Sequence, residues 1–156
     1  MTPDLGRQAV YAAEIAAFEG TSFEVVVPIE HLIQLARLII NAEWWPHGEI
    51  EVVAARSDAG SSSTRQHGRR RPVVRLAAPQ MTPATLVHEF AHVLAGLEHG
   101  HRQVFRRAHL DLVAEVFGDT AANWLLDAYT SMGLAPGPRT WPVPPGRLAD
   151  SGPVVL

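Results

Sequence analysis

Apolar residues in the first part of the chain follow both helical and strand-like spacings. In residues 29–44 they recur three and four positions apart, at Leu32, Leu35, Ala36, Ile39 and Ile40. This spacing predicts a helix that packs in a core, and Pro46 is expected to stop it. The alanine-rich segment 8–18 fits either a helix or a strand-like entry, whereas the valine-rich segment 23–28 has the composition of a strand.

Two short valine-rich runs, residues 50–56 and 72–78, predict two β-strands. The segment between them, residues 57–71, is small, polar and basic. We expect a long loop there. Three roles fit it: a mobile lid over a cleft, a patch for an acidic ligand, or a disordered surface loop.

Helix signals mark both ends of the segment that follows. Thr82 is a suitable N-cap, Pro83 suits the first helical position, and Gly96 suits the position just after the last turn. The apolar residues between them lie mostly on one side of the predicted helix, and they are Leu86, Phe90, Val93 and Leu94. This helix therefore has one side to bury and another to present to a cleft.

Two more helices are predicted beyond this point. Residues 101–117 place His101, Phe105, Ala108 and Leu112 on one inward face. Residues 120–132 carry apolar residues at helical spacing and end at Gly133. Together the elements predict an α+β fold, with one domain over residues 1–134 and a proline-rich C-terminal tail, expected to be extended, over residues 135–156.

Composition narrows the class of protein. A chain of 156 residues with 47% hydrophobic content is long enough for one domain with a core. It has no cysteine, which excludes disulfides and thiolate ligands and suits a reducing cytosol. No signal peptide or membrane segment is evident, so a cytoplasmic protein is expected. The net charge of −3 carries no overall signature of nucleic-acid binding.

The strongest chemical signal is the run His88-Glu89-Phe90-Ala91-His92, which has the pattern H-E-x-x-H. Histidines four positions apart lie on the same face of a helix, where both imidazoles can bind one Zn²⁺ ion. Glu89 would then act as the general base on a zinc-bound water. The alternative is a solvated helix face with two unrelated histidines, but the helix signals at both ends argue against it.

A catalytic zinc site needs a third protein ligand. His101 is the preferred candidate, placed in the first turn of the following helix, and His99 is the alternative. Other acidic and histidine residues nearby are expected to have other roles. Glu98 and Asp111 are expected to be surface charges and His109 an exposed helix residue. Glu115 would lie roughly 21 Å along the helix from His101, so it is expected to cap or pair elsewhere.

Four aromatic residues are further candidates for the functional site. Tyr11 or Tyr129 could donate a hydrogen bond to the oxyanion of a tetrahedral intermediate, although burial with a backbone partner is an equally ordinary role for a tyrosine. Trp44 and Trp45 could form a substrate platform, but paired tryptophans at the end of an apolar helix usually complete a core.

Four segments resemble a small family of single-domain metallohydrolases, over roughly residues 7–134. They are residues 7–14, Trp44-Trp45, residues 82–92 and residues 100–105. More distantly, the second half is similar to SprT-like and minimal gluzincin-type zinc peptidases, in which a His-x-x-x-Phe segment follows the metal helix. Here that segment is His101 to Phe105.

The resemblance implies a zincin-like domain. Such a domain has a small β-sheet, an active-site helix bearing H-E-x-x-H, and a following helix that carries the third ligand. The resemblance also implies His88, His92 and His101 as ligands of Zn²⁺, with Glu89 as the base. In zinc peptidases with this motif, an edge strand beside the cleft can pair with an extended substrate, and either predicted strand could serve.

The expected function is therefore a zinc metallopeptidase-like hydrolase that acts on a peptide or protein. One alternative is a DNA-associated protease, in which Arg65, Arg69, Arg70 and Arg71 hold nucleic acid. Another is a non-catalytic binding module in which zinc joins two helices. No membrane partner is expected, and the sequence does not predict an oligomeric state.

Overall fold

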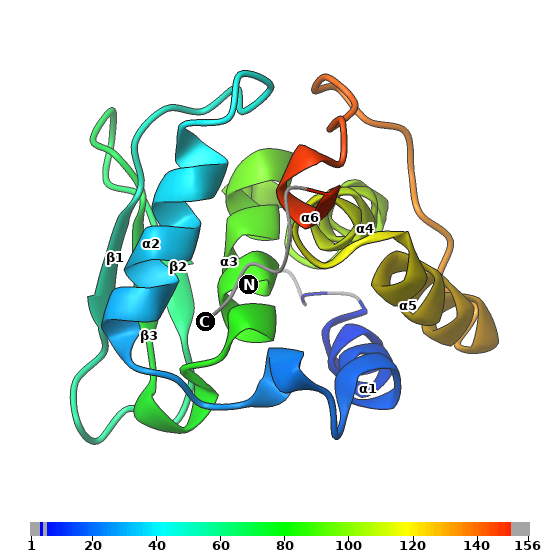
Figure 1. The fold of residues 1–156 in the computed structure, drawn as a ribbon, viewed down its shortest axis with the longest axis horizontal. Helices are drawn as coiled ribbons and strands as arrows, with labels where there is room; N and C mark the ends of the chain where they lie inside the picture. The colour runs from blue at the N-terminus through cyan, green and yellow to red at the C-terminus, as the bar shows by residue number, and fades with distance from the viewer. Residues whose placement is uncertain (1–3, 5, 151–156) are drawn as a thin grey trace.

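The structure is a computed structural model that describes residue 4 and residues 6–150, without the side chains of residues 147 and 150. Its helices and strands follow one another along the chain as shown in Figure 1. In order they are α1 (Arg7–Phe18), η1 (Ser22–Glu24), α2 (Ile29–Ile40), β1 (Glu51–Ala54), β2 (Ser63–Arg65), β3 (Val73–Leu76), η2 (Ala78–Gln80), α3 (Pro83–Ala95), η3 (Leu97–His99), α4 (Gln103–Phe117), α5 (Asp119–Ser131) and α6 (Arg147–Asp150).

The three strands form a mixed sheet in the order β1-β3-β2. β1 runs parallel to β3, with Val52 opposite Val74, and β2 runs antiparallel to β3, with Thr64 opposite Val74. Val52, Val74 and Leu76 are buried, whereas Arg75 is exposed. The sheet therefore has one covered face and one solvated face, as expected of a small sheet packed on helices.

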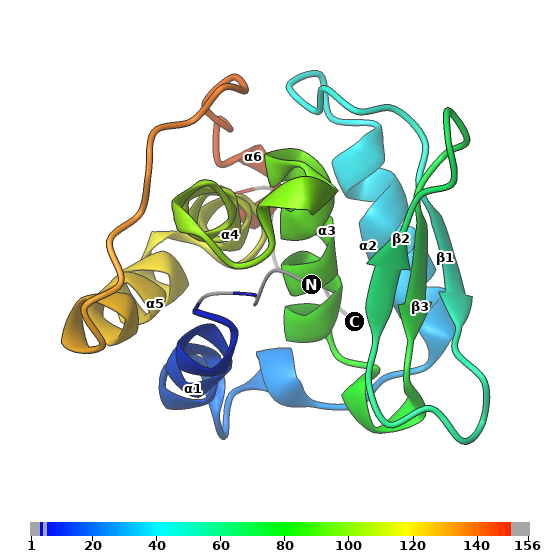
Figure 2. The same cartoon turned by 180° about the vertical axis from the view of Figure 1, so that it is seen from behind.

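Helix α3 occupies the centre of the molecule. It lies between the sheet with α2 on one side and the group α1, α4 and α5 on the other, and both views show this arrangement (Figures 1 and 2). Leu86 and Phe90 of α3 are fully buried, as is Phe105 of α4. This central position is what brings residues of α1, β2 and the start of α4 around the same helix.

The α+β class is confirmed, and the four predicted helices are present as α2, α3, α4 and α5. Segment 8–18, for which helix and strand both fitted, is helical in α1, and α2 ends at Ile40, before Pro46. Trp44 and Trp45 are buried in the core, as expected. No helix in the described part of the chain combines the length and the apolar character that a membrane crossing requires.

One strand prediction and one loop prediction were wrong. Residues 23–28 form the end of η1 and an irregular segment instead of a strand. The ring of Phe23 stacks on Phe117, with centroids 4.0 Å apart, so tertiary packing decides the conformation here and outweighs the β propensity of the valines. The segment 57–71 is not a continuous loop, because it contains β2.

The segment after Leu134 packs on α4. Trp141 is buried, and its indole N–H donates to Asp111 Oδ2 at 2.8 Å. Residues 142–145 have no regular structure, and α6 follows them. The predicted extended tail is thus partly helical and in contact with the domain over residues 135–150, whereas residues 151–156 lie outside the described residues.

Candidate metal centre

The motif histidines lie on a helix whose ends form as predicted. Thr82 Oγ1 accepts a hydrogen bond from the Thr85 N–H at 3.1 Å, and Pro83 occupies the first helical position. Gly96 ends the helix with a φ of 103°, a value that favours glycine. His88 and Glu89 in the middle of this helix are buried, so the polar residues face the interior of the molecule and not bulk solvent.

Three histidines converge at one point. Each of His88, His92 and His101 offers one ring nitrogen, and these atoms all lie within 4.8 Å of one another. The Nε2 atoms of His88 and His101 are 3.1 Å apart. Two nitrogens bound at 2.0–2.1 Å to a tetrahedral zinc ion would lie about 3.3 Å apart, so this spacing fits a shared metal.

His101 was predicted in the first turn of the following helix. It lies instead in the turn before α4, which begins at Gln103, and reaches His88 and His92 from there. The turn depends on Gly100, which has a φ of 54°. A Cβ atom at this position would also lie 2.7 Å from Asp4 Oδ1. Glycine therefore both permits the turn and leaves room for the aspartate that holds His101.

The alternative third ligand lies elsewhere. The side chain of His99 is 38% exposed, and its Nε2 atom is 3.4 Å from Glu98 Oε1 on the surface. The Glu98 side chain is itself exposed, as expected. The structure therefore brings His101, and not His99, to His88 and His92.

Two of the three histidines have a carboxylate behind them. His88 Nδ1 pairs with Glu14 Oε1, and His101 Nδ1 lies 2.6 Å from Asp4 Oδ2. A histidine that donates its Nδ1 proton to a carboxylate presents the lone pair of Nε2, and such partners orient metal ligands and raise their basicity. Glu14 and Asp4 were not among the predicted site residues. In the sequence, Glu14 is marked only as a member of segment 7–14, one of the segments that resemble the metallohydrolase family.

Burial and nearby charges affect the protonation of these groups. Burial, reinforced by the other histidines, lowers the pKa of His92 to about 2, and burial also lowers the pKa of His101. Both rings are therefore neutral near pH 7, which is the form that binds a metal. For His88, burial opposes protonation, but the charge and hydrogen bond of Glu14 outweigh it and raise the pKa.

Glu89 lies next to the histidines, with Oε2 3.8 Å from His88 Nε2. Its other oxygen, Oε1, accepts a hydrogen bond from the hydroxyl of Thr64 on β2 at 2.9 Å. Burial raises the pKa of Glu89, and the charge of Glu14 adds to the effect. A carboxylate with a raised pKa and one fixed oxygen suits a general base.

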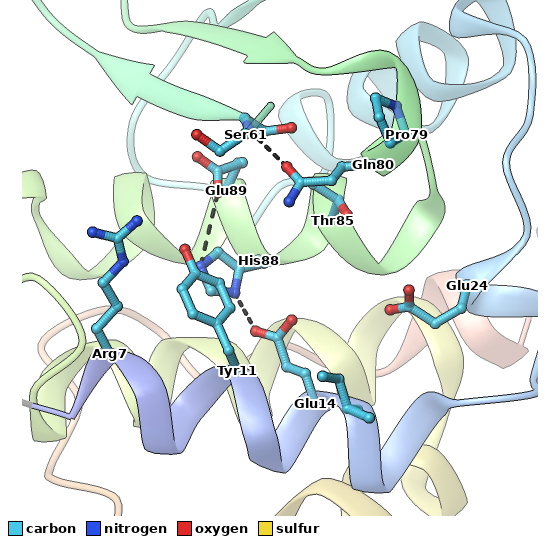
Figure 3. Close-up of a pocket in the computed structure, with 12 residues that line it drawn as sticks. Arg7, Tyr11, Glu14, Glu24, Ser61, Pro79, Gln80, Thr85, His88 and Glu89 are labelled. Atoms are coloured by element: carbon cyan, nitrogen blue, oxygen red, sulfur yellow. Dashed lines mark hydrogen bonds and ion pairs between the residues drawn. The ribbon is translucent and has the colours of Figure 1, made fainter. Parts of the chain in front are cut away.

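A pocket of about 350 Å³ opens beside Glu89 and His88, between α1 and the loop that precedes β2 (Figure 3). Tyr11 lines it and stacks on the His88 ring, with centroids 5.4 Å apart and planes 9° apart. Tyr129, the other candidate, is fully buried, and its hydroxyl lies 2.6 Å from His109 Nδ1. Of the two predicted tyrosines, only Tyr11 reaches the pocket.

Two predictions about surface residues were wrong. His109 is buried next to Tyr129, with its Nε2 3.7 Å from Glu14 Oε1. Asp111 is also buried. It accepts hydrogen bonds from Arg139 and Trp141, two residues of the C-terminal segment whose position the helical pattern could not reveal.

Glu115 has the role expected of it. It is buried and accepts hydrogen bonds from the backbone N–H groups of Gly146 and Leu148. The carboxylate thus caps the start of α6, because the first N–H groups of a helix have no partner within the helix.

The edge strand beside the site is β2. The strand formed by residues 72–78, one of the two predicted edge candidates, is the central strand β3. No strand of the described part of the chain pairs with the outer edge of β2. Arg65, at its end, and the arginines at positions 69–71 are exposed. Their role in binding nucleic acid stays a prediction.

Comparison of the chain with protein-family models, with curated proteins and with solved structures finds no match.

The three histidine ligands indicate which metals the site could bind. Three imidazole ligands suit zinc and also copper, iron and nickel, whereas calcium and magnesium prefer oxygen ligands. The residues present therefore fit a transition metal with one further ligand position.

Proposed function

We propose that this protein is a zinc-dependent hydrolase, and specifically a metallopeptidase. One observation carries the proposal: the ring nitrogens of His88, His92 and His101 converge while the carboxylate of Glu89 lies beside them and lines an open pocket. A purely structural zinc site is usually closed by four protein ligands, whereas a catalytic site has three and an accessible position.

The roles of the chain's own residues follow from their positions. A bound zinc ion would act as a Lewis acid that polarises a carbonyl and makes water a better nucleophile near pH 7. Glu89 takes a proton from the attacking water through Oε2, while Thr64 holds Oε1 in place. The same carboxyl group then delivers the proton to the leaving amine.

Backbone groups near the site favour a peptide as the substrate. The hydrogen bond from Thr64 to Glu89 places the unpaired edge of β2 directly beside the base. An extended peptide can add to such an edge through main-chain hydrogen bonds. Tyr11, at the wall of the pocket, is positioned to donate to the developing oxyanion.

The proposal is tested with Glu89→Gln, which keeps the shape of the side chain and removes the base. Wild type and variant are loaded with zinc and assayed on a library of fluorogenic peptides. We expect hydrolysis by the wild type and a loss on the order of a thousandfold or more in the variant, with zinc content unchanged.

A matched control is Glu98→Gln, which changes a carboxylate that is exposed outside the pocket. It should leave the rate unchanged. Equal activity of Glu89→Gln and wild type would contradict the mechanism. A fully zinc-loaded wild type that cleaves no peptide would contradict the peptidase proposal and would favour a non-catalytic zinc module.

A further inference from the structure

The pocket beside the candidate metal centre has opposite charges at its two ends. Arg7 lines it near the start of α1, and Glu24 lines it at the far end, where its carboxylate points toward the space above Glu14 (Figure 3). His88 and Glu89 lie between these two ends. A ligand that extends away from the metal ligands along the pocket therefore meets Glu24.

Glu24 is held in this position by its neighbours. Phe23, the preceding residue, stacks on Phe117 with centroids 4.0 Å apart and meets the edge of Phe18 at 6.0 Å. Further along, the backbone N–H of Val27 donates to the carbonyl of Met81 at 2.9 Å. The backbone on both sides of Glu24 is thus fastened to the core, which fixes the place from which its carboxylate enters the pocket.

Within the described residues, the carboxylate of Glu24 has no hydrogen-bond or ion-pair partner. The other two carboxylates of the pocket are engaged, Glu14 with His88 and Glu89 with Thr64. Arg7 is the one arginine or lysine among the lining residues, and it lies at the opposite end. Partial burial and the charge of Glu14 raise the pKa of Glu24, so a cation beside it would relieve an unfavourable environment.

Between the two ends, the wall is partly apolar. Tyr11 and Ile15 of α1 and Pro79 contribute to it, and Ile15 is 59% exposed without a covering partner. An apolar wall that leads to a carboxylate matches the side chains of lysine and arginine, which pack an aliphatic stem and extend a charged head. Neither an acidic nor a purely apolar side chain would satisfy both parts of this pocket.

We propose that the pocket binds a lysine or arginine side chain of the substrate, next to the scissile bond, and that Glu24 is its counter-charge. This specificity rests on the proposed peptidase function, because the pocket would hold the substrate residue adjacent to the bond that the water activated by Glu89 attacks. Glu24 is then a specificity-determining residue and takes no part in the chemistry.

The test uses zinc-loaded protein and peptides that differ at one position only, which carries lysine, norleucine or glutamate. Norleucine has the apolar stem without the charge. In the wild type we expect kcat/KM for the lysine peptide to exceed that for norleucine by about threefold to fivefold, as for a charge pair at an exposed carboxylate. Glu24→Gln should abolish the difference while cleavage of the norleucine peptide stays within about twofold, and Glu24→Arg should favour the glutamate peptide.

Glu19→Gln is the matched control, because this exposed carboxylate at the end of α1 does not line the pocket. Thermal melting of each variant checks the fold. Cleavage without a preference for lysine, or a preference that survives Glu24→Gln, overturns the inference and leaves the peptidase function intact.

A binding measurement tests the preference for lysine even if the protein does not cleave peptides. Fluorescence anisotropy with zinc-loaded Glu89→Gln compares the affinities of the labelled lysine and norleucine peptides, whether or not the wild type cleaves them. Tighter binding of the lysine peptide that is lost in Glu24→Gln/Glu89→Gln supports the inference. Equal binding of the two peptides overturns it.

Discussion

Asp4 holds His101 at two points, although the two residues are 97 positions apart in the chain. One carboxylate oxygen accepts the backbone N–H of His101 at 3.0 Å, and the other lies 2.6 Å from the ring Nδ1. The first contact fixes the backbone of the turn, and the second orients the imidazole. Together they direct Nε2 of His101 toward His88, where the two Nε2 atoms lie 3.1 Å apart.

We expect Asp4→Asn to lower zinc affinity by about 10- to 100-fold, which is the usual effect of removing such a partner of a ligating histidine. The amide cannot accept a proton from Nδ1 as strongly as the carboxylate does. Competition with a chromophoric chelator measures the affinity. Asp58→Asn is the control, because that side chain is 74% exposed and pairs with Arg56, away from the histidines of the site. An unchanged affinity in Asp4→Asn would show that the contact does not support the site.

Thr64→Val should slow hydrolysis without loss of zinc. The substitution keeps the shape of the side chain and removes the hydroxyl that donates to Glu89 Oε1. The base would lose its fixed orientation, so we expect kcat to fall about 10-fold or more. Ser63→Ala, at the adjacent position of β2, should have little effect. If both variants hydrolyse peptides at the wild-type rate, Thr64 has no role in orienting the base.

The two tyrosines are expected to respond differently to loss of the hydroxyl. Tyr11→Phe should lower kcat on the order of 100-fold with little change in stability, because in the proposed mechanism this hydroxyl donates to the oxyanion. Tyr129→Phe should instead destabilise the protein by about 1–3 kcal/mol, because it leaves His109 Nδ1 buried without its partner. Steady-state kinetics and denaturant unfolding of both variants separate these roles. The reverse pattern would exchange the two assignments.

Zinc should raise the melting temperature. At a free zinc concentration of 100 times Kd the ion adds about 2.7 kcal/mol to the free energy of unfolding, which for a chain of this size corresponds to roughly 5–10 °C. Scanning fluorimetry with zinc and with a chelator measures the shift. His92→Ala should abolish most of it, and a shift of full size in that variant would remove His92 from the ligand set.

The local part of the candidate site could be predicted from the sequence. The spacing of His88 and His92 places both on one helix face, and Thr82, Pro83 and Gly96 mark the ends of that helix without reference to the rest of the fold. These features depend on contacts within a few residues. Helical propensity, capping and glycine conformation act at that range, so the pattern carries the information.

The residues that support the site could not be predicted in the same way. Asp4, Glu14 and Thr64 reach the histidines or Glu89 from segments that are 97, 74 and 25 positions away from their partners. His109 was expected on the surface, but α1 and α5 cover it. Its burial follows from the packing of α4 against neighbouring helices. A pattern of apolar positions does not reveal that a polar residue such as His109 belongs to the buried face.

The most direct test of the metal centre is elemental analysis of wild type, His101→Ala and His99→Ala, each purified without added metal. We predict one equivalent of zinc in the wild type and in His99→Ala, and a loss of zinc in His101→Ala, because His101 lies with His88 and His92 while His99 lies on the surface with Glu98. A wild type that holds no zinc after reconstitution, or zinc that is lost in His99→Ala and kept in His101→Ala, would contradict the assignment.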